Sequence, residues 1–540
     1  MRIPCGPLRQ RGPAQRAPDG HEPENEISPQ LVPEVHGVNA VHGQRRTSVV
    51  GSERWVKPDR LFDRDDEWVA LMSFSSDPHP GTGLGVVMGR PHQGKTLLLE
   101  SVARATGGFY FCGQQATEAE SLRRVGEEYA RYRRVAQPSH WRDWKEGLDA
   151  MLALGDTRPL PVIIDSFPDL VAASPALPSV IHGALRHLDR PPLENRARLL
   201  LGGETAPVMT RLFASSSPLL ALAALKLDIQ PMDFRGAARL WGIDDPRLAF
   251  LVYTVVGGTP AYRHDYVGDD VPVDRDDFDA WVCRTVLNPR TPLFHEARHL
   301  LDEETGPWSC GACHSVLTAL ARGCTTHGEI ATFLGQQLAD ASRALAVLRD
   351  HGLLQSQTDG LQPGITHHHI TDPLLAFEHA VARPRRAALE QSDAETVWED
   401  ARTDFNTLVA GPRFAQVCRD WAARFANPAT FGAERGTASY GSLSNPSTTA
   451  GLDAEVVVRR RNGHMRGPLL SVGLARWHTG MDIHHLQRLR RILDALDSRE
   501  DLSRVRLALY GASGFSPELH AAHARGEVLL VDLEDLYRSV

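Results

Sequence analysis

Eight consecutive residues limit the fold of this chain more than any others. Positions 89–96 read GRPHQGKT, which fits the pattern G-x-x-x-x-G-K-[ST] at every position. An apolar run, Leu84 to Met88, precedes them, and a segment with helical character, Leu97 to Ala105, follows. Strand, glycine-containing loop and helix in this order bind phosphate, because backbone N–H groups and the amino end of the helix point at the anion. The segment predicts a parallel α/β fold with a phosphate loop, residues 89–96, at one edge of its sheet.

The residue types in this loop match the chemistry of bound ATP and Mg²⁺. Its glycines let the backbone curl around the phosphates, Lys95 can bridge the outer phosphates, and the Thr96 hydroxyl can bind Mg²⁺. The alternative is a chance match in a turn, which the flanking strand and helix argue against. The predicted nucleotide-binding residues are Gly89, Arg90, Pro91, His92, Gln93, Gly94, Lys95 and Thr96.

A second apolar run, Leu160 to Ile164, ends at Asp165. An acid in this position holds Mg²⁺ through water, so Asp165 is predicted to assist catalysis and to share the metal with Thr96. The next residue is Ser166, where many ATPases place a glutamate that activates the attacking water, and serine has little basicity. We therefore expect ATP binding with weak or absent hydrolysis. The simpler alternative is that Asp165 caps a helix at Phe167 to Leu170.

The length of 540 residues is too great for one hydrophobic core, and the pattern changes along the chain. Alternating short strands and helices predict a parallel sheet covered on both faces, and three short helices before a strand-turn-strand predict a winged helix. The glycine- and serine-rich stretch 436–451 is expected to be a mobile loop. The expected divisions are a disordered leader (1–58) that leaves the true start open, a P-loop ATPase domain (59–262), a helical lid or arm (263–308), a winged-helix domain (309–376) and a second α/β domain (377–540).

Charge and composition narrow the class of protein. The net charge of −8 gives no general attraction to nucleic acid, so any contact with DNA must come from a local patch. No apolar run approaches the ~20 residues of a membrane span, and the leader lacks the apolar core of a secretory signal. An odd number of cysteines, seven, favours reduced thiols. We expect a soluble, cytoplasmic protein with no membrane partner.

A series of segments resembles, in order, the archaeal-type ATPases of the AAA-related, STAND-like group, which carry a C-terminal winged helix and a PD-(D/E)XK nuclease-like domain. The resemblance extends over roughly 480 residues, from about Phe62 to the end, in line with the multi-domain length. Its carriers are RDDEW (64–68), VVMGRPHQGKT, FYFCGQQATEAESL, VIIDSFPDL with PSVI, LLLGGETAPVM, DIQPMDFRGAARLWGI, VVGGTPAYR, ITDPLLAFE and GFSPELHAAHARGEVLLVDLEDLY.

The resemblance implies that Lys95 and Thr96 bind phosphate and Mg²⁺, that Asp165 belongs to the second acidic motif, and that a polar sensor of the γ-phosphate follows Gly203. Several positions depart from that pattern. Ser166 replaces an acid, the sensor position holds Glu204 beside Thr205, and Leu222 and Ala223 stand where relatives commonly have an arginine that acts on a neighbour's nucleotide. These departures again predict slow turnover, unless Glu204 or Asp169 serves as the base.

The nuclease-like domain that the resemblance implies also departs from its pattern. The positions that would gather a divalent metal hold Ala415, Glu455 and Leu474-Ala475-Arg476. Of these only Glu455, with Asp453 nearby, could bind a metal, and Arg476 is a poor substitute for lysine because it stays protonated. We expect no nuclease activity and a structural or partner-binding role, the alternative being a metal-dependent nuclease that needs Glu455.

Further polar groups have a simple and a functional interpretation each. The spacing of Cys310, Cys313, Cys324 and His327 superficially suits zinc, although buried cysteines at the ends of a helix explain it more simply, and zinc binding stays open. The run His367-His368-His369 ends the wing and could contact DNA phosphate or a metal, but it is expected to be a solvated turn. Arg459-Arg460-Arg461 with Arg466 is either an anion contact or a solvated hairpin.

The leading prediction is an ATP-binding switch of the AAA-related P-loop type, with ATP and Mg²⁺ as ligands. The alternative is a DNA-binding, transcription-linked winged-helix protein in which nucleotide is structural, although Arg343 and Arg349 are the only cations in the region of the recognition helix. The winged helix is expected to contact DNA or a protein, and a second copy of the chain is a further expected partner.

Overall fold

The computed structural model describes residues 55–188, 195–204, 207–214, 217–305, 310–335, 338–391, 393–432, 436–443, 452–462, 465–496 and 500–538. Most of the expected leader, residues 1–54, therefore lies outside the described residues. The last part of that segment is described, and the carbonyl of Trp55 accepts a hydrogen bond from the Trp68 indole. No described helix combines the length and the apolar character that a membrane span requires.

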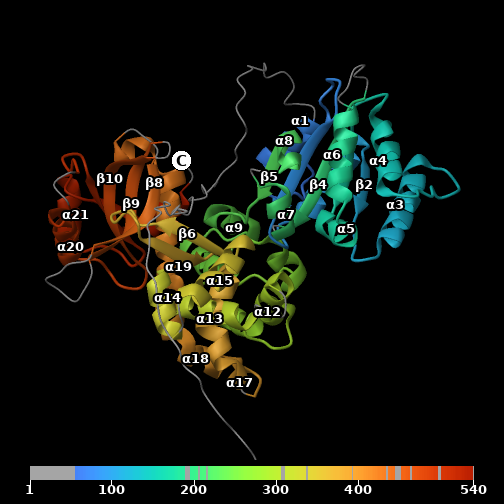
Figure 1. The fold of residues 1–540 in the computed structure, drawn as a ribbon. Helices are drawn as coiled ribbons and strands as arrows, with labels where there is room; N and C mark the ends of the chain where they lie inside the picture. Colours follow the sequence, from blue (N-terminus) through green and yellow to red (C-terminus); the bar gives the residue numbers. More distant parts are fainter. Residues whose placement is uncertain are drawn as a thin grey trace, which may run out of the picture. The chain divides into compact units, whose positions relative to one another are not determined.

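The first sheet contains five parallel strands in the order β2-β3-β4-β1-β5. Figure 1 labels β2, β4 and β5 of this sheet. Each strand is short and mostly apolar, which suits a sheet buried on both faces. The strands are β1 (Gly83–Gly89), β2 (Phe109–Cys112), β3 (Leu160–Asp165), β4 (Ala197–Glu204) and β5 (Ala223–Ile229). The predicted parallel sheet is confirmed.

Helices cover both faces of the first sheet. Alternate residues of a strand point to opposite faces, so Val86 packs in one core cluster and Val87 in another. Helices α1 (Asp65–Ser75) and α2 (Lys95–Thr106) cover the face of Val87. The other face is covered mainly by α3 (Glu118–Arg133), α4 (Trp144–Leu152) and α6 (Leu177–Leu188). The remaining helices of this region are α5 (Phe167–Ala173), α7 (Pro207–Leu212) and α8 (Pro218–Leu222), with the short η1 (Ala153–Gly155).

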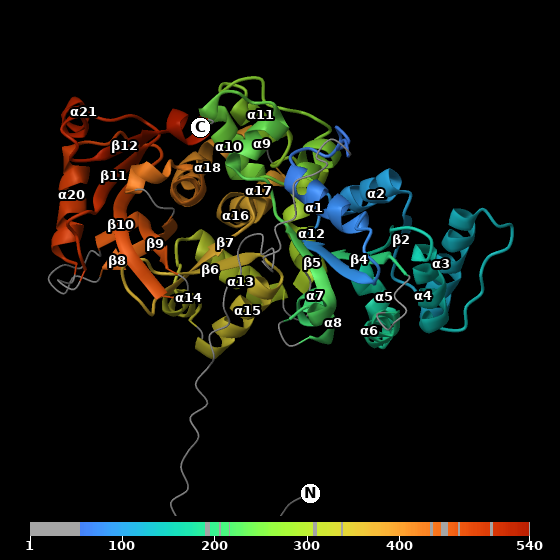
Figure 2. The same ribbon diagram turned by 90° about the horizontal axis from the view of Figure 1, so that it is seen from above.

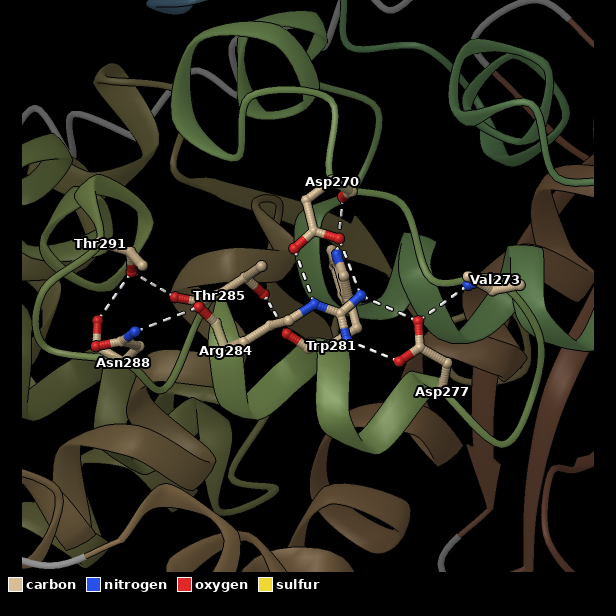
Figure 3. Close-up of polar contacts among 8 residues, drawn as sticks. All are labelled: Asp270, Val273, Asp277, Trp281, Arg284, Thr285, Asn288 and Thr291. Carbon is tan, nitrogen blue, oxygen red and sulfur yellow. Dashed lines mark hydrogen bonds and ion pairs between the residues drawn. The ribbon is translucent and has the colours of Figure 1, made fainter.

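A helical region follows, and it begins with two helices that precede residue 263, where the helical lid or arm is expected to start. It contains α9 (Phe234–Trp241), α10 (Pro246–Val256), η2 (Tyr262–Tyr266), α11 (Phe278–Arg284) and α12 (Pro292–Thr305). The loop between η2 and α11 is tied to α11 by Arg284, whose guanidinium contacts Asp270 and Asp277 at distances of 2.7–3.0 Å (Figure 3). The Trp281 indole adds a 2.9 Å hydrogen bond to the Asp270 carbonyl. This network fixes the chain directly after Tyr266.

Three helices and a two-stranded antiparallel sheet come next, in the predicted order. They are α13 (Cys310–Ala321), α14 (His327–Leu334), α15 (Leu338–Asp350), β6 (Leu354–Thr358) and β7 (Thr366–Ile370). The expectation of a solvated turn at residues 367–369 is wrong, because these histidines form the middle of β7 and pair with β6. His367 is buried against Asp359, and burial lowers the pKa of His368 to about 4 and that of His369 to about 3.

A helical segment leads from β7 to the second sheet. It contains α16 (Pro373–Phe377), α17 (Arg386–Leu389), α18 (Ala394–Asp404) and α19 (Gly411–Asp420), with the short η3 (Glu378–Ala382), η4 (Arg383–Arg385), η5 (Phe405–Ala410), η6 (Trp421–Phe425) and η7 (Pro428–Phe431).

The second sheet is mixed and has the order β12-β11-β10-β9-β8. Its strands are β8 (Gly436–Leu443), β9 (Leu452–Asn462), β10 (Met465–Arg476), β11 (Arg506–Gly511) and β12 (Leu529–Asp532). Helices α20 (Ile483–Asp494) and α21 (Pro517–Ala524) lie along one face (Figure 2), α19 covers the other, and α22 (Leu533–Tyr537) ends the described chain.

The expected loop at 436–451 is wrong in its first half. Residues 436–443 form β8, because pairing with β9 outweighs the weak strand preference of glycine and serine. Residues 444–451 lie outside the described residues.

Candidate nucleotide-binding site

The phosphate loop joins the end of β1 to the start of α2. Two of its positions require glycine, each for a different structural reason. Gly94 caps α2 with a left-handed backbone, φ +82°, which side chains disfavour. At Gly89 the reason is space, since a Cβ would lie 2.5 Å from the Ile229 carbonyl oxygen. His92 also has a positive φ of 64°, a strained conformation that is concentrated at functional sites.

Lys95 is the first residue of α2, and its side chain is buried in the loop. Its Nζ donates a 2.7 Å hydrogen bond to the carbonyl of Arg90, so the loop curls around the ammonium group. Thr96, in the first turn of α2, is exposed. An ammonium, an exposed hydroxyl and the amino end of a helix at one place fit the phosphates and Mg²⁺ of a nucleotide.

Asp165 lies at the end of β3 and is almost fully buried. Its carboxylate accepts hydrogen bonds from the Tyr110 hydroxyl, 3.1 Å, and the Ser166 N–H, 2.8 Å. Gly202 on β4 makes room for it, since a Cβ there would lie 2.6 Å from Asp165 Oδ1. Because these are its hydrogen bonds, the carboxylate does not cap the second or third residue of α5. Asp165 lies at the same edge of the sheet as the phosphate loop, with β4 between its strand and β1.

The neighbours of Asp165 differ in basicity. Ser166 has a left-handed backbone, φ 50°, and its Oγ lies 3.6 Å from the Cys112 thiol. Asp169 is in the first turn of α5, and partial burial raises the pKa of its carboxyl. Glu204, exposed at the end of β4, pairs in register with Gly89, so a carboxylate lies beside the start of the loop. Thr205 lies outside the described residues.

The position at which the resemblance implies an arginine is at the other edge of the sheet. Ala223, at the start of β5, pairs in register with Leu84 at the start of β1, while the phosphate loop follows the end of β1. Leu222 precedes it at the end of α8. Neither side chain carries a charge that could reach phosphate.

Side chains of the loop itself contact distant parts of the chain, and sequence reasoning missed all of these contacts. Arg90 forms a 2.8 Å ion pair with Asp372. Gln93 donates a 3.1 Å hydrogen bond to the Thr259 hydroxyl. Local patterns carry no signal for such pairs, since Arg90 and Asp372 are 282 positions apart.

His92 makes the third set of these contacts. Its Nε2 lies 3.2 Å from Glu296 Oε1 and 3.2 Å from the Tyr266 hydroxyl. Glu296 is nearly fully buried on α12, and Tyr266 ends η2, directly before the loop that Arg284 fixes. The middle of the phosphate loop is thus held by the helical region.

The second sheet brings Glu455 and Arg476 together. Arg476 Nη1 lies 2.9 Å from Glu455 Oε1, and the Ala475 N–H donates to Oε2 of the same carboxylate at 3.3 Å. Ala415 and Leu474 are buried and carry no ligand atom. Arg476 therefore forms an ion pair with the Glu455 carboxylate that a metal ion would need as a ligand.

The groups considered for zinc lie in and after α13. Cys313 is fully buried, Cys324 is partly buried, and His327 Nε2 lies 2.9 Å from both the Ser342 hydroxyl and the Leu338 carbonyl. The side chain of Cys310 lies outside the described residues. Within the described ranges, no three His, Cys, Asp or Glu side chains are grouped to hold a metal ion.

The basic residues of β9 do not form one surface patch. Arg459 is buried, forms a 2.7 Å ion pair with Glu500 and donates to the carbonyls of Gly360 and Gly467. The side chain of Arg466 lies outside the described residues. The first arginine of the run is therefore a structural group.

No family model matches the chain, and no curated protein matches it. Among solved structures it is similar to the Walker-type ATPase PABY2304 of Pyrococcus abyssi, at 16% identity and a TM-score of 0.44, with 59% of this chain and 96% of that one covered. The Aeropyrum pernix ORC2 protein has 13% identity, a TM-score of 0.40 and coverages of 65% and 97%. Cdc6p from Pyrobaculum aerophilum has 15% identity and a TM-score of 0.30, with 65% of this chain and 97% of that one covered. At these identities and scores the likeness carries no functional conclusion for this chain.

Proposed function

We propose that this chain is an ATP-binding protein of the AAA-related P-loop type that acts as a nucleotide-dependent switch, with weak or absent hydrolysis. One observation carries the proposal. The strand β1, the loop 89–96 and the helix α2 form a complete phosphate-binding unit, and the buried Asp165 lies at the same sheet edge.

The residues present fit a nucleotide with its magnesium ion. Lys95 would exchange the Arg90 carbonyl for the outer phosphates, since an anion is a stronger acceptor for an ammonium than a neutral carbonyl. Thr96 would bind Mg²⁺ directly and Asp165 would hold it through water, and the bound ion would neutralise phosphate charge. Ser166 leaves the attacking water without a strong base, which supports slow turnover.

Replacement of Asp165 by asparagine tests the metal part of this proposal. The asparagine side chain keeps an oxygen that can accept from Tyr110 or Ser166, but it removes the charge that attracts Mg²⁺. We expect Mg²⁺ to strengthen ATP binding by the wild type and to have at least about tenfold less effect in D165N, measured by titration calorimetry with and without Mg²⁺. Asp169→Asn is the matched control. An unchanged Mg²⁺ effect in D165N would contradict the assignment.

The second candidate function is DNA binding through a winged helix formed by residues 310–370. Arg343 and Arg349 on α15 are exposed, which favours it. The hairpin β6–β7 argues against its use as a wing, because its turn is packed on the second sheet. Leu361 lies in the core of that sheet, and the Gly360 N–H donates a 2.8 Å hydrogen bond to the Tyr440 carbonyl. We therefore propose that this module couples parts of the same protein.

A further inference from the structure

Arg90 is held at both ends in the phosphate loop. Its main-chain carbonyl accepts the Lys95 ammonium at 2.7 Å, and its guanidinium forms the 2.8 Å ion pair with Asp372. The side chains of Arg90 and Asp372 are only 10% and 2% exposed, so the pair is poorly screened by solvent. A change at Lys95 therefore acts on the same residue that contacts Asp372.

Asp372 connects this pair to β7 and α16. It follows the end of β7 by two residues and caps α16, because its Oδ1 accepts from the N–H groups of Leu374 and Leu375 at 2.8 and 3.2 Å. Its other oxygen, Oδ2, receives Arg90. Each carboxylate oxygen thus has its own hydrogen-bond donors. A shift of the Arg90 guanidinium therefore alters the contacts of Asp372, which lies between β7 and α16.

The strand β7 continues the connection to the second sheet. His367 on β7 contacts Asp359 Oδ2 at 3.0 Å, and the same oxygen accepts from the N–H and the hydroxyl of Ser442 on β8, both at 2.8 Å. Burial would raise the pKa of Asp359, but the hydrogen bonds from His367, Gln362, Leu361 and Ser442 lower it overall. A charged, fully buried carboxylate with these donors joins β7 firmly to β8.

We propose that the Arg90–Asp372 ion pair is the contact through which occupancy of the phosphate loop reaches β7 and, through Asp359, the second sheet. This inference rests on the nucleotide binding proposed above. A bound phosphate takes Lys95 from the Arg90 carbonyl, whereas the ion pair with Asp372 keeps Arg90 in the position that offers this carbonyl to Lys95. Asp372 therefore opposes nucleotide binding and nucleotide weakens the pair, since coupling between two sites is reciprocal.

The test compares the wild type with Asp372→Asn. Asparagine keeps an oxygen that can cap α16 and removes only the charge opposite Arg90. We expect D372N to bind MgADP about fivefold more tightly in titration calorimetry, within the usual range of coupling between sites. In hydrogen exchange, MgADP should increase exchange in β7 and β8 of the wild type, and this increase should be lost in D372N. Glu500→Gln, which breaks the Arg459–Glu500 pair, is the matched control and should bind and respond as the wild type does.

The outcomes separate this inference from the proposed function. Failure of the wild type to bind MgADP and MgATP would overturn both. Binding by the wild type with equal or weaker affinity in D372N, or an unchanged exchange response in D372N, would overturn the coupling alone. If D372N does not fold, Arg90→Gln removes the same pair from the other side and must show the same loss of response.

Discussion

The residue after Asp165 decides how much chemistry the site can perform. Ser166 lies where a general base is expected, but a hydroxyl is a much weaker base than a carboxylate. Its Oγ lies next to the Cys112 thiol. Glu204 and Asp169 are the nearby carboxylates that the sequence suggested as substitutes. Burial raises the pKa of the Asp169 carboxyl, which disfavours its charged form but makes its carboxylate a stronger base.

Placing a glutamate at 166 should increase hydrolysis. We expect Ser166→Glu to raise steady-state phosphate release from ATP at least about tenfold, since a positioned base commonly contributes more than this. Ser166→Gln is the control, because it has the same size and meets the same strain from the left-handed backbone, φ 50°, without the charge. Fast phosphate release by the wild type, equal to that of S166E, would show that another residue already serves as the base.

At the level of single residues, the sequence predicts the parts of the site that are close together in the chain. Lys95 and Thr96 could be found because their spacing within the loop is dictated by backbone geometry. The contacts of Arg90 with Asp372 and of His92 with Glu296 could not, because they depend on how separate elements pack. No local pattern encodes such a pair.

At the level of elements, the hairpin β6–β7 shows where local reasoning succeeds and where it fails. The sequence pattern predicts a strand, a turn and a strand after three short helices, and the structure contains both strands. Polarity alone places the histidines of β7 in solvent, whereas in the structure Asp359 and Ser356 supply hydrogen-bond partners for His367 and His368. The sequence pattern does not predict β8, because its glycines and serines have a weak strand preference and the strand forms by pairing with β9.

Leu361 provides the test of this packing. It lies at the hairpin turn, is 5% exposed and belongs to the core of the second sheet. We expect Leu361→Ala to lower the free energy of opening of β9 by about 2–4 kcal/mol, the usual effect of truncating a buried leucine. Native-state hydrogen exchange measures this quantity for peptides of β9. Leu338→Ala, at an exposed position on α15, is the control, and equal effects of the two variants would contradict the docking of the hairpin.

For the whole molecule, the question is whether nucleotide or DNA is the primary ligand. If the winged-helix interpretation includes DNA, binding of a duplex should be salt-dependent and should weaken when Arg343 and Arg349 are both replaced by alanine. We expect instead that fluorescence anisotropy shows no difference between the wild type and this double variant, because the hairpin turn is packed on the second sheet. Salt-dependent binding that the double variant loses would favour the DNA-binding alternative.

The most direct test of the nucleotide site is the binding of MgATP to the wild type and to Lys95→Ala in titration calorimetry. The Lys95 ammonium is buried in the loop and is the group placed to hold the outer phosphates. We expect the wild type to bind and Lys95→Ala to lose at least about tenfold in affinity, the cost of a lost charge-assisted hydrogen bond. Lys226→Ala, at an exposed position on β5, should bind as the wild type does. Equal binding by the wild type and Lys95→Ala would contradict the assignment of the phosphate loop.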